Sequence, residues 1–77
     1  MIKSVAEALQ QAGFAHARND EDGVAFWEKE TTTVAVDPIE NVAIISRYSA
    51  FTGQRSMFTR VIDADKQSEH IALIATR

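Results

Sequence analysis

The residue types that most often carry chemistry are few in this chain and stand apart from one another. Its two histidines, His16 and His70, each lack a second ligand at the four-residue spacing that helical metal sites use. Asp63 and Asp65 are spaced like the first ligands of a calcium-binding loop, but the central glycine and the closing glutamate of that loop are absent. Capping of a C-terminal helix explains both aspartates better, so we predict no metal site.

Nucleophilic catalysis finds equally little support. Ser46, Ser49, Thr52 and Ser56 gather near one predicted loop, but no histidine accompanies them in a pattern typical of an activated nucleophile. The chain has no cysteine and its three glycines are isolated, which excludes a cysteine nucleophile and a glycine-rich phosphate loop. A chain of 77 residues also has little material for a pocket that excludes water. We therefore expect no catalytic residue, no cofactor and no enzymatic activity.

Charge is distributed unevenly along the chain. The net charge is −3, yet residues 19–42 hold seven acids against one base, Lys29, whereas residues 43–62 hold three arginines and no acid. This layout is typical either of ordinary solvated faces or of a bipolar surface that orients a partner.

The acidic part suggests a surface that binds a basic groove on another protein, because carboxylates spaced along strands and turns can imitate phosphates. The alternative is that these charges only keep turns and an edge strand soluble. The candidate residues are Asp20, Glu21, Asp22, Glu28 and Glu30.

The basic part, residues 47–60, interleaves arginines with aromatic residues. Arginines beside exposed rings on a sheet are the components of a surface that binds single-stranded nucleic acid. Against this hypothesis, the chain is acidic overall, and Phe58 also suits a hydrophobic core. The candidate residues are Arg47, Tyr48, Arg55, Phe58 and Arg60.

Three aromatic residues are candidates for anchors in a protein interface: Trp27, Tyr48 and Phe51. Phe26 and Trp27 are adjacent on a predicted strand, so their side chains point to opposite faces of the sheet. If helices cover only one face, one of these two rings must point outward.

The elements that position these residues follow from hydrophobic periodicity and turn residues. Residues 3–12 predict an amphipathic helix with Ser4 as its N-cap, Gly13 at its end and Ile2 in its apolar stripe. Strands are predicted at residues 14–19, 24–30, 34–37, 42–48 and 55–62, and the apolar run of residues 42–48 predicts a strand covered on both faces. A second helix follows Asp63 or Asp65, with Ile71, Ile74 and Ala75 on its inner side.

Together these elements predict a single α+β domain over residues 1–77. It has an N-terminal helix, a four- to five-stranded, mostly antiparallel sheet and a C-terminal helix, because the connections between strands are short. The alternation of residues 14–19 is weak, so the element order is α-β-β-β-β-β-α, or α-β-β-β-β-α without that strand.

Composition favours a cytoplasmic protein without a membrane partner. The absence of cysteine suits a reducing compartment, and no apolar run approaches the roughly 18 residues of a membrane span. The N-terminus also lacks the apolar core of a secretory signal. A core this small gains from association with a second copy, so a homodimer is a reasonable expectation.

The leading functional hypothesis is a non-catalytic protein-binding module. It would act as a small cytosolic regulator or inhibitor that blocks a partner protein sterically and electrostatically. In size, charge and lack of cysteine the chain resembles small phage and mobile-element proteins that block host machinery, including the anti-CRISPR inhibitors. Two alternatives stay open: a single-stranded nucleic-acid-binding module that uses residues 47–60, and a self-associating structural subunit.

Overall fold

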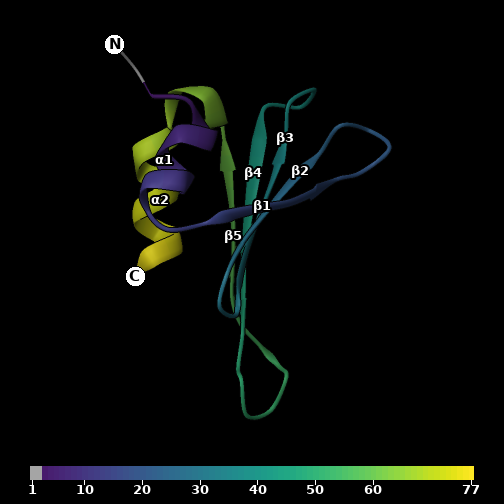
Figure 1. The fold of residues 1–77 in the computed structure, drawn as a ribbon, viewed down its shortest axis with the longest axis vertical. Helices are drawn as coiled ribbons and strands as arrows, with labels where there is room; N and C mark the ends of the chain where they lie inside the picture. The colour runs from purple at the N-terminus through teal and green to yellow at the C-terminus, as the bar shows by residue number, and fades with distance from the viewer. Residues whose placement is uncertain (1–2) are drawn as a thin grey trace.

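A computed structural model describes residues 3–77 of the chain. Two helices lie on one side of a five-stranded sheet (Figure 1). The predicted α+β class is confirmed, and all five strands are present. The elements are α1 (Val5–Gln11), β1 (Ala15–Asn19), β2 (Ala25–Lys29), β3 (Thr32–Asp37), β4 (Val42–Tyr48), β5 (Arg55–Ile62), the short 3-10 helix η1 (Ala64–Lys66) and α2 (Ser68–Thr76).

The first helix, α1, has the N-cap and the terminating glycine that its local sequence predicts, although Val5–Gln11 is shorter than the predicted range of residues 3–12. The side-chain oxygen of Ser4 accepts a hydrogen bond from the backbone N–H of Glu7 at 3.1 Å, which satisfies one free donor at the helix start. Gly13 adopts a φ of 95°, a conformation that ends the helix and that other residues rarely adopt. Ile2, which was predicted to join the apolar stripe, lies outside the described residues.

The sheet is an antiparallel meander in which each strand pairs with the next one in the chain. Short connections force this order, since only Glu30 and Thr31 separate β2 from β3. The β1–β2 connection is held by Asp20, whose carboxylate oxygen accepts hydrogen bonds from the backbone N–H groups of Asp22 and Val24, both at 2.9 Å.

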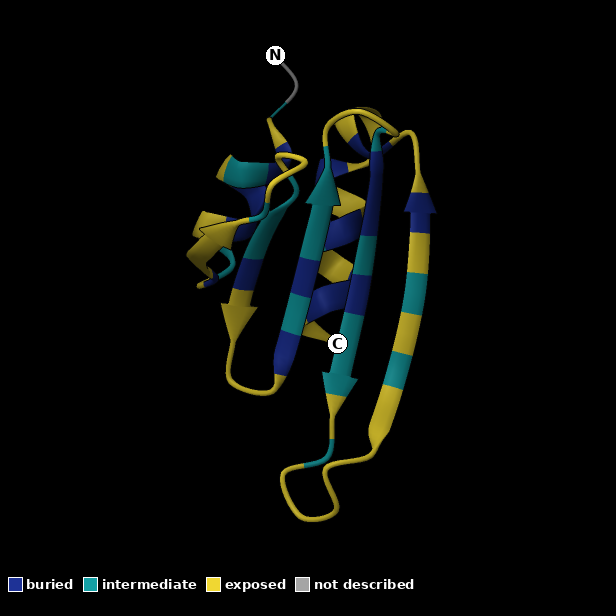
Figure 2. Cartoon of the chain, turned by 90° about the vertical axis from the view of Figure 1, so that its right-hand side faces the viewer, coloured by how far each residue is buried: buried dark blue, intermediate teal, exposed yellow. Residues whose placement is uncertain are grey.

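Both helices pack on the same face of the sheet, and the core lies between the two layers (Figure 2). Within residues 3–77 no helix or strand covers the opposite face, so the prediction that β4 is covered on both faces is wrong. Ile44 and Ser46 of β4 lie on this uncovered side and are only partly buried. The core residues are Val5, Leu9, Phe14, Trp27, Val34, Ala43, Ile45, Val61, Ala64, Ile71, Ile74 and Ala75.

The second helix, α2, has the predicted inner stripe but not the predicted cap. Ile71, Ile74 and Ala75 are buried, as expected. The helix begins at Ser68, and neither aspartate caps it. Asp65 instead accepts a hydrogen bond from the side-chain amide of Asn41 at 2.6 Å, so its carboxylate ties η1 to the β3–β4 turn.

Candidate functional site

In the described part of the chain, one face of the sheet has no covering element, and we call this surface the open face (Figure 2). Its residues align in rows, because the register places Phe26, Ala35, Ile44 and Arg60 side by side across β2 to β5. Phe58, in the neighbouring row, is 54% exposed. The open face therefore presents apolar and aromatic side chains directly to solvent.

Arginine side chains lie against the aromatic rings of the open face. The guanidinium carbon of Arg18 is 4.1 Å from the centre of the Phe26 ring. The guanidinium carbon of Arg55 is 4.6 Å from the centre of the Phe58 ring and 5.9 Å from that of Tyr48. These distances are typical of cation–π contacts, which hold the cations at the sheet surface.

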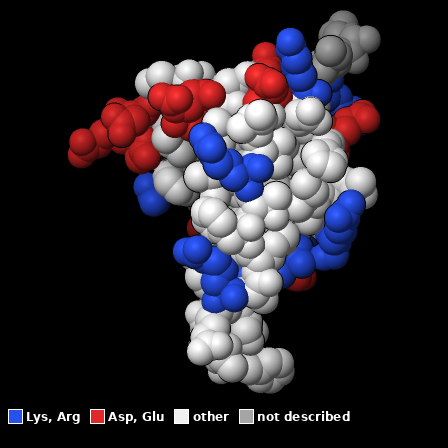
Figure 3. Space-filling view, turned by 180° about the vertical axis from the view of Figure 1, so that it is seen from behind, with Lys and Arg blue, Asp and Glu red and all other residues white. Residues whose placement is uncertain are grey.

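The open face is basic although the chain as a whole is acidic. Arg18, Arg55 and Arg60 are exposed on it, against Glu28 and, at the end of β3, Asp37. The Asp37 carboxylate already accepts hydrogen bonds from two backbone N–H groups of the following turn. In Figure 3 a dense acidic group occupies one corner of the molecule, away from several of the basic side chains. The other acids lie on helices, turns and strand ends: Glu7, Asp20, Glu21, Asp22, Glu30, Glu40, Asp63, Asp65 and Glu69.

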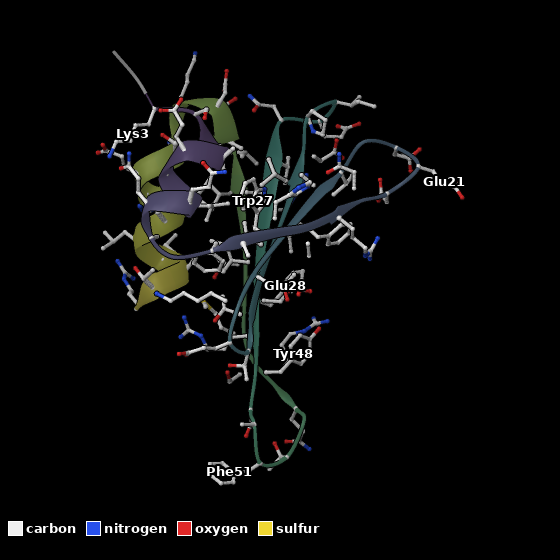
Figure 4. The ribbon with its side chains drawn as sticks, in the orientation of Figure 1. Lys3, Glu21, Trp27, Glu28, Tyr48 and Phe51 are labelled. Atoms are coloured by element: carbon white, nitrogen blue, oxygen red, sulfur yellow. The ribbon has the colours of Figure 1, made fainter. Side chains whose placement is uncertain are left out.

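Trp27 was predicted as an exposed anchor, and this prediction is wrong. Its side chain is only 6% exposed and belongs to the core between the sheet and the helices. Figure 4 shows it on the helix side of the sheet, whereas Tyr48 lies on the opposite side. Phe26, the neighbour of Trp27, takes the outward position because successive residues of a strand point to opposite faces.

Arg47 was predicted as a nucleic-acid ligand, but it lies on the helix-covered face. Its guanidinium donates hydrogen bonds of 2.8 Å to the carbonyl oxygens of Ala75 and Arg77, at the end of α2. Its Nε donates to the hydroxyl oxygen of Thr32, also at 2.8 Å. Arg47 therefore joins the sheet to the free carbonyls at the C-terminus of α2 and does not belong to the open face.

Replacing Arg47 with alanine is expected to destabilise the fold by about 2–3 kcal/mol, because hydrogen bonds from a charged donor are lost at a half-buried site. Arg47→Lys should recover only part of this loss, since an ammonium group does not reproduce the planar guanidinium. Urea unfolding followed by circular dichroism measures both variants. An Arg47→Ala variant within about 0.5 kcal/mol of the wild type would contradict this structural role.

The five acidic candidates do not form one continuous surface. Asp20, Glu21 and Asp22 lie at the tip of the β1–β2 hairpin (Figure 4 labels Glu21). Glu30 lies beyond the other end of β2, a separation of roughly 17 Å for five strand residues. Glu28 is on the open face, between Ala15 of β1 and Thr33 of β3. These acids were grouped as one surface because they are close together in the chain. In the structure, the length of β2 separates Glu30 from the three acids at the hairpin tip.

The remaining aromatic candidates lie along the β4–β5 hairpin. Tyr48 ends β4 on the open face and is 40% exposed. Phe51 is 98% exposed in the loop at the far end of the hairpin (Figure 4). Phe51 therefore extends away from the rest of the molecule and does not fold back over the sheet.

Sequence reasoning missed two residues of the open face, Arg18 and Phe26. Phe26 was recognised only as one of a pair, of which either member could have faced outward. Arg18 lies on β1, where a shift in the β1–β2 register between His16 and Arg18 weakens the alternation of residue types. The register of β1 against β2 was the missing information, because it places Arg18 opposite Phe26.

The described part of the chain contains no group of three or more His, Cys, Asp or Glu side chains arranged to hold a metal ion. Across residues 3–77, neither helix has the length and apolar character needed to cross a membrane. No protein-family model matches the chain, and comparisons with curated proteins and with solved structures find no significant similarity.

Proposed function

We propose that this chain is a non-catalytic module that binds single-stranded nucleic acid on its open face. The observation that carries the proposal is the reversal of charge: the chain is acidic, yet Arg18, Arg55 and Arg60 share one uncovered sheet face with exposed aromatic rings. Judged from the sequence alone, the acidity of the whole chain argued against nucleic-acid binding. That objection weakens because most of the acids lie away from this face.

The chemistry of the open face suits an unpaired strand. Bases of a single strand are splayed outward and can stack on rings such as Phe58 and Tyr48, whatever their sequence. Guanidinium groups beside those rings can pair with backbone phosphates or stack on base planes. A half-apolar sheet face fits exposed bases better than it fits the charged backbone of a duplex. The lack of cysteine is consistent with a reducing compartment. A cytoplasmic location is therefore part of the same proposal.

A fluorescent oligonucleotide titrated with the protein at several salt concentrations tests this proposal. If three arginines neutralise three phosphates, the logarithm of the binding constant should fall with the logarithm of salt concentration with a slope of roughly −2. Arg60→Ala should make that slope shallower by about 0.7. Arg77→Ala, at the end of α2 on the other side of the sheet, is the matched control and should leave the slope unchanged.

Three outcomes would count against the proposal. They are a flat titration at low salt, an affinity independent of salt, and an equal effect of the Arg60 and Arg77 substitutions. Stronger binding to duplex than to single strands would also contradict it, because the stacking argument requires unpaired bases.

A protein-binding regulator or inhibitor is the second candidate, and the exposure of Phe51 favours it. A ring that is 98% exposed at a hairpin tip resembles the aromatic anchors that dominate many protein interfaces. The acidic tip of the β1–β2 hairpin could orient such a partner electrostatically. The oligonucleotide titration separates the two candidates, since this second function predicts no binding to single strands.

A further inference from the structure

The last strand, β5, is an unprotected edge of the sheet. It is eight residues long and contains no proline, and no strand among residues 3–77 pairs with its outer side (Figure 2). The opposite edge, β1, has five residues and an irregular register with β2. Natural proteins usually protect exposed edges by shortening or bulging them, and β1 has both features. β5 is longer, and its one irregularity lies at Ser56 near its start, which leaves residues 57–62 in regular register.

Hydrogen bonding elsewhere in the sheet identifies which backbone groups of β5 are unpaired. The backbone N–H of Tyr48 donates to the carbonyl of Thr31, so even-numbered residues of β4 bond toward β3 and odd-numbered ones toward β5. Through the β4–β5 register, residues 57, 59 and 61 bond toward β4. In the regular part of β5, which begins at Met57, the backbone groups that point outward are those of Phe58, Arg60 and Ile62.

The helix layer also stops short of β5. Met57 and Thr59 point toward the helix side, yet both are only partly buried. A hollow of about 400 Å³ lies beside Thr59, between the end of β5 and α2. Its lining includes Thr59, Val61, Gln67, His70 and Ile74. A neighbouring sheet that continued past β5 would cover part of this side.

We propose that β5 pairs antiparallel with β5 of a second copy of this chain, so that two sheets join into one, with Thr59 on the two-fold axis. In this register Phe58 pairs with Arg60 of the second copy and Arg60 with its Phe58, so the outward backbone groups nearest the axis are paired on both strands.

Side-chain chemistry supports the same register. Each Arg60 lies opposite a Phe58 ring, which gives two cation–π pairs across the interface. An axis at residue 60 would instead set two arginines directly opposite each other, which is repulsive. This inference does not depend on the nucleic-acid proposal, because it rests on the backbone of an edge and not on the chemistry of the open face.

Single cysteines test the register directly, because the chain contains none of its own. Residues 59 of the two copies would face each other as a non-hydrogen-bonded pair, about 4.5 Å apart between Cα atoms, which suits a disulfide. Under mild oxidation Thr59→Cys should therefore double in mass from 8.5 kDa as a covalent dimer. Met57→Cys is the matched control and should form no covalent dimer, since the two residues 57 would lie roughly 13 Å apart.

A second pair of variants tests the backbone contribution. Arg60→Pro and Arg60→Ala both remove the guanidinium, but only proline removes the outward N–H. Light scattering should find twice the chain mass for the wild type and Arg60→Ala, and the single-chain mass for Arg60→Pro. The fluorescence of the buried Trp27 reports whether each variant is folded, and the cysteine pair decides alone if Arg60→Pro is not. A wild type at 8.5 kDa at every concentration, or equal cross-linking of the two cysteine variants, overturns the proposal.

Discussion

Trp27→Ala is expected to lower the free energy of unfolding by about 3–5 kcal/mol, the usual cost of removing a buried tryptophan. The side chain is 6% exposed and belongs to the core between the sheet and the two helices. Native domains have roughly 0.05–0.15 kcal/mol of stability per residue, which is about 4–12 kcal/mol for a chain of this length. This substitution should therefore remove much of the stability, and at 37 °C a large share of the protein should be unfolded.

Phe26→Ala is the matched control, because the two residues are neighbours in β2 and point to opposite faces. Phe26 is half-buried on the open face, so its loss should cost only about 1 kcal/mol. Urea unfolding followed by far-ultraviolet circular dichroism suits both variants, since it does not depend on the tryptophan itself. Similar midpoints for the two variants would show that the helices do not cover the face that carries Trp27.

Phe58→Ala is expected to weaken binding of single-stranded oligonucleotides by about 1–3 kcal/mol, or roughly 5- to 150-fold. The ring is 54% exposed, lies on the open face and carries the guanidinium of Arg55 at 4.6 Å. Its removal takes away both a stacking surface and the support of a cation. Fold stability should change little, because a ring this exposed contributes little to the core.

Leu73→Ala provides the control for this experiment. Leu73 is 55% exposed, nearly the same as Phe58, but it lies on α2, on the other side of the sheet. Its removal deletes a comparable amount of apolar surface without touching the open face, so the oligonucleotide affinity should stay within about twofold of the wild type. Equal losses from the two variants would mean that general surface hydrophobicity, and not the open face, holds the oligonucleotide.

The two halves of the charge pattern take different roles in the structure. The acids that sequence analysis grouped as one surface are divided between a hairpin tip, a turn and the open face. The arginines of β5 are joined by Arg18 from the other end of the sheet, so the open face has arginine at both of its edges. Charge counted along the chain therefore described the composition of the segments but not the sign of the surface they form.

The features that the sequence alone determined depend on residues close together in the chain. Ser4 and Glu7 set the start of α1 through a hydrogen bond between residues three positions apart in the chain. Gly13 supplies the conformation that ends the helix. The alternation of residue types in β5 gave the bounds of that strand and the grouping of its side chains into two faces. Such features can be read locally, because the interactions that produce them close within one turn of helix or a few strand residues.

Tertiary structure alone decided which face of the sheet is covered. Strand alternation separates Phe26 from Trp27 but treats the two faces alike, so only the packing of both helices on one side makes Trp27 core and leaves Phe26 exposed. Arg47 likewise looked like a surface ligand until α2, 28 residues further along the chain, placed the carbonyl of Ala75 beside it. These outcomes depend on contacts between distant segments, which no local pattern encodes.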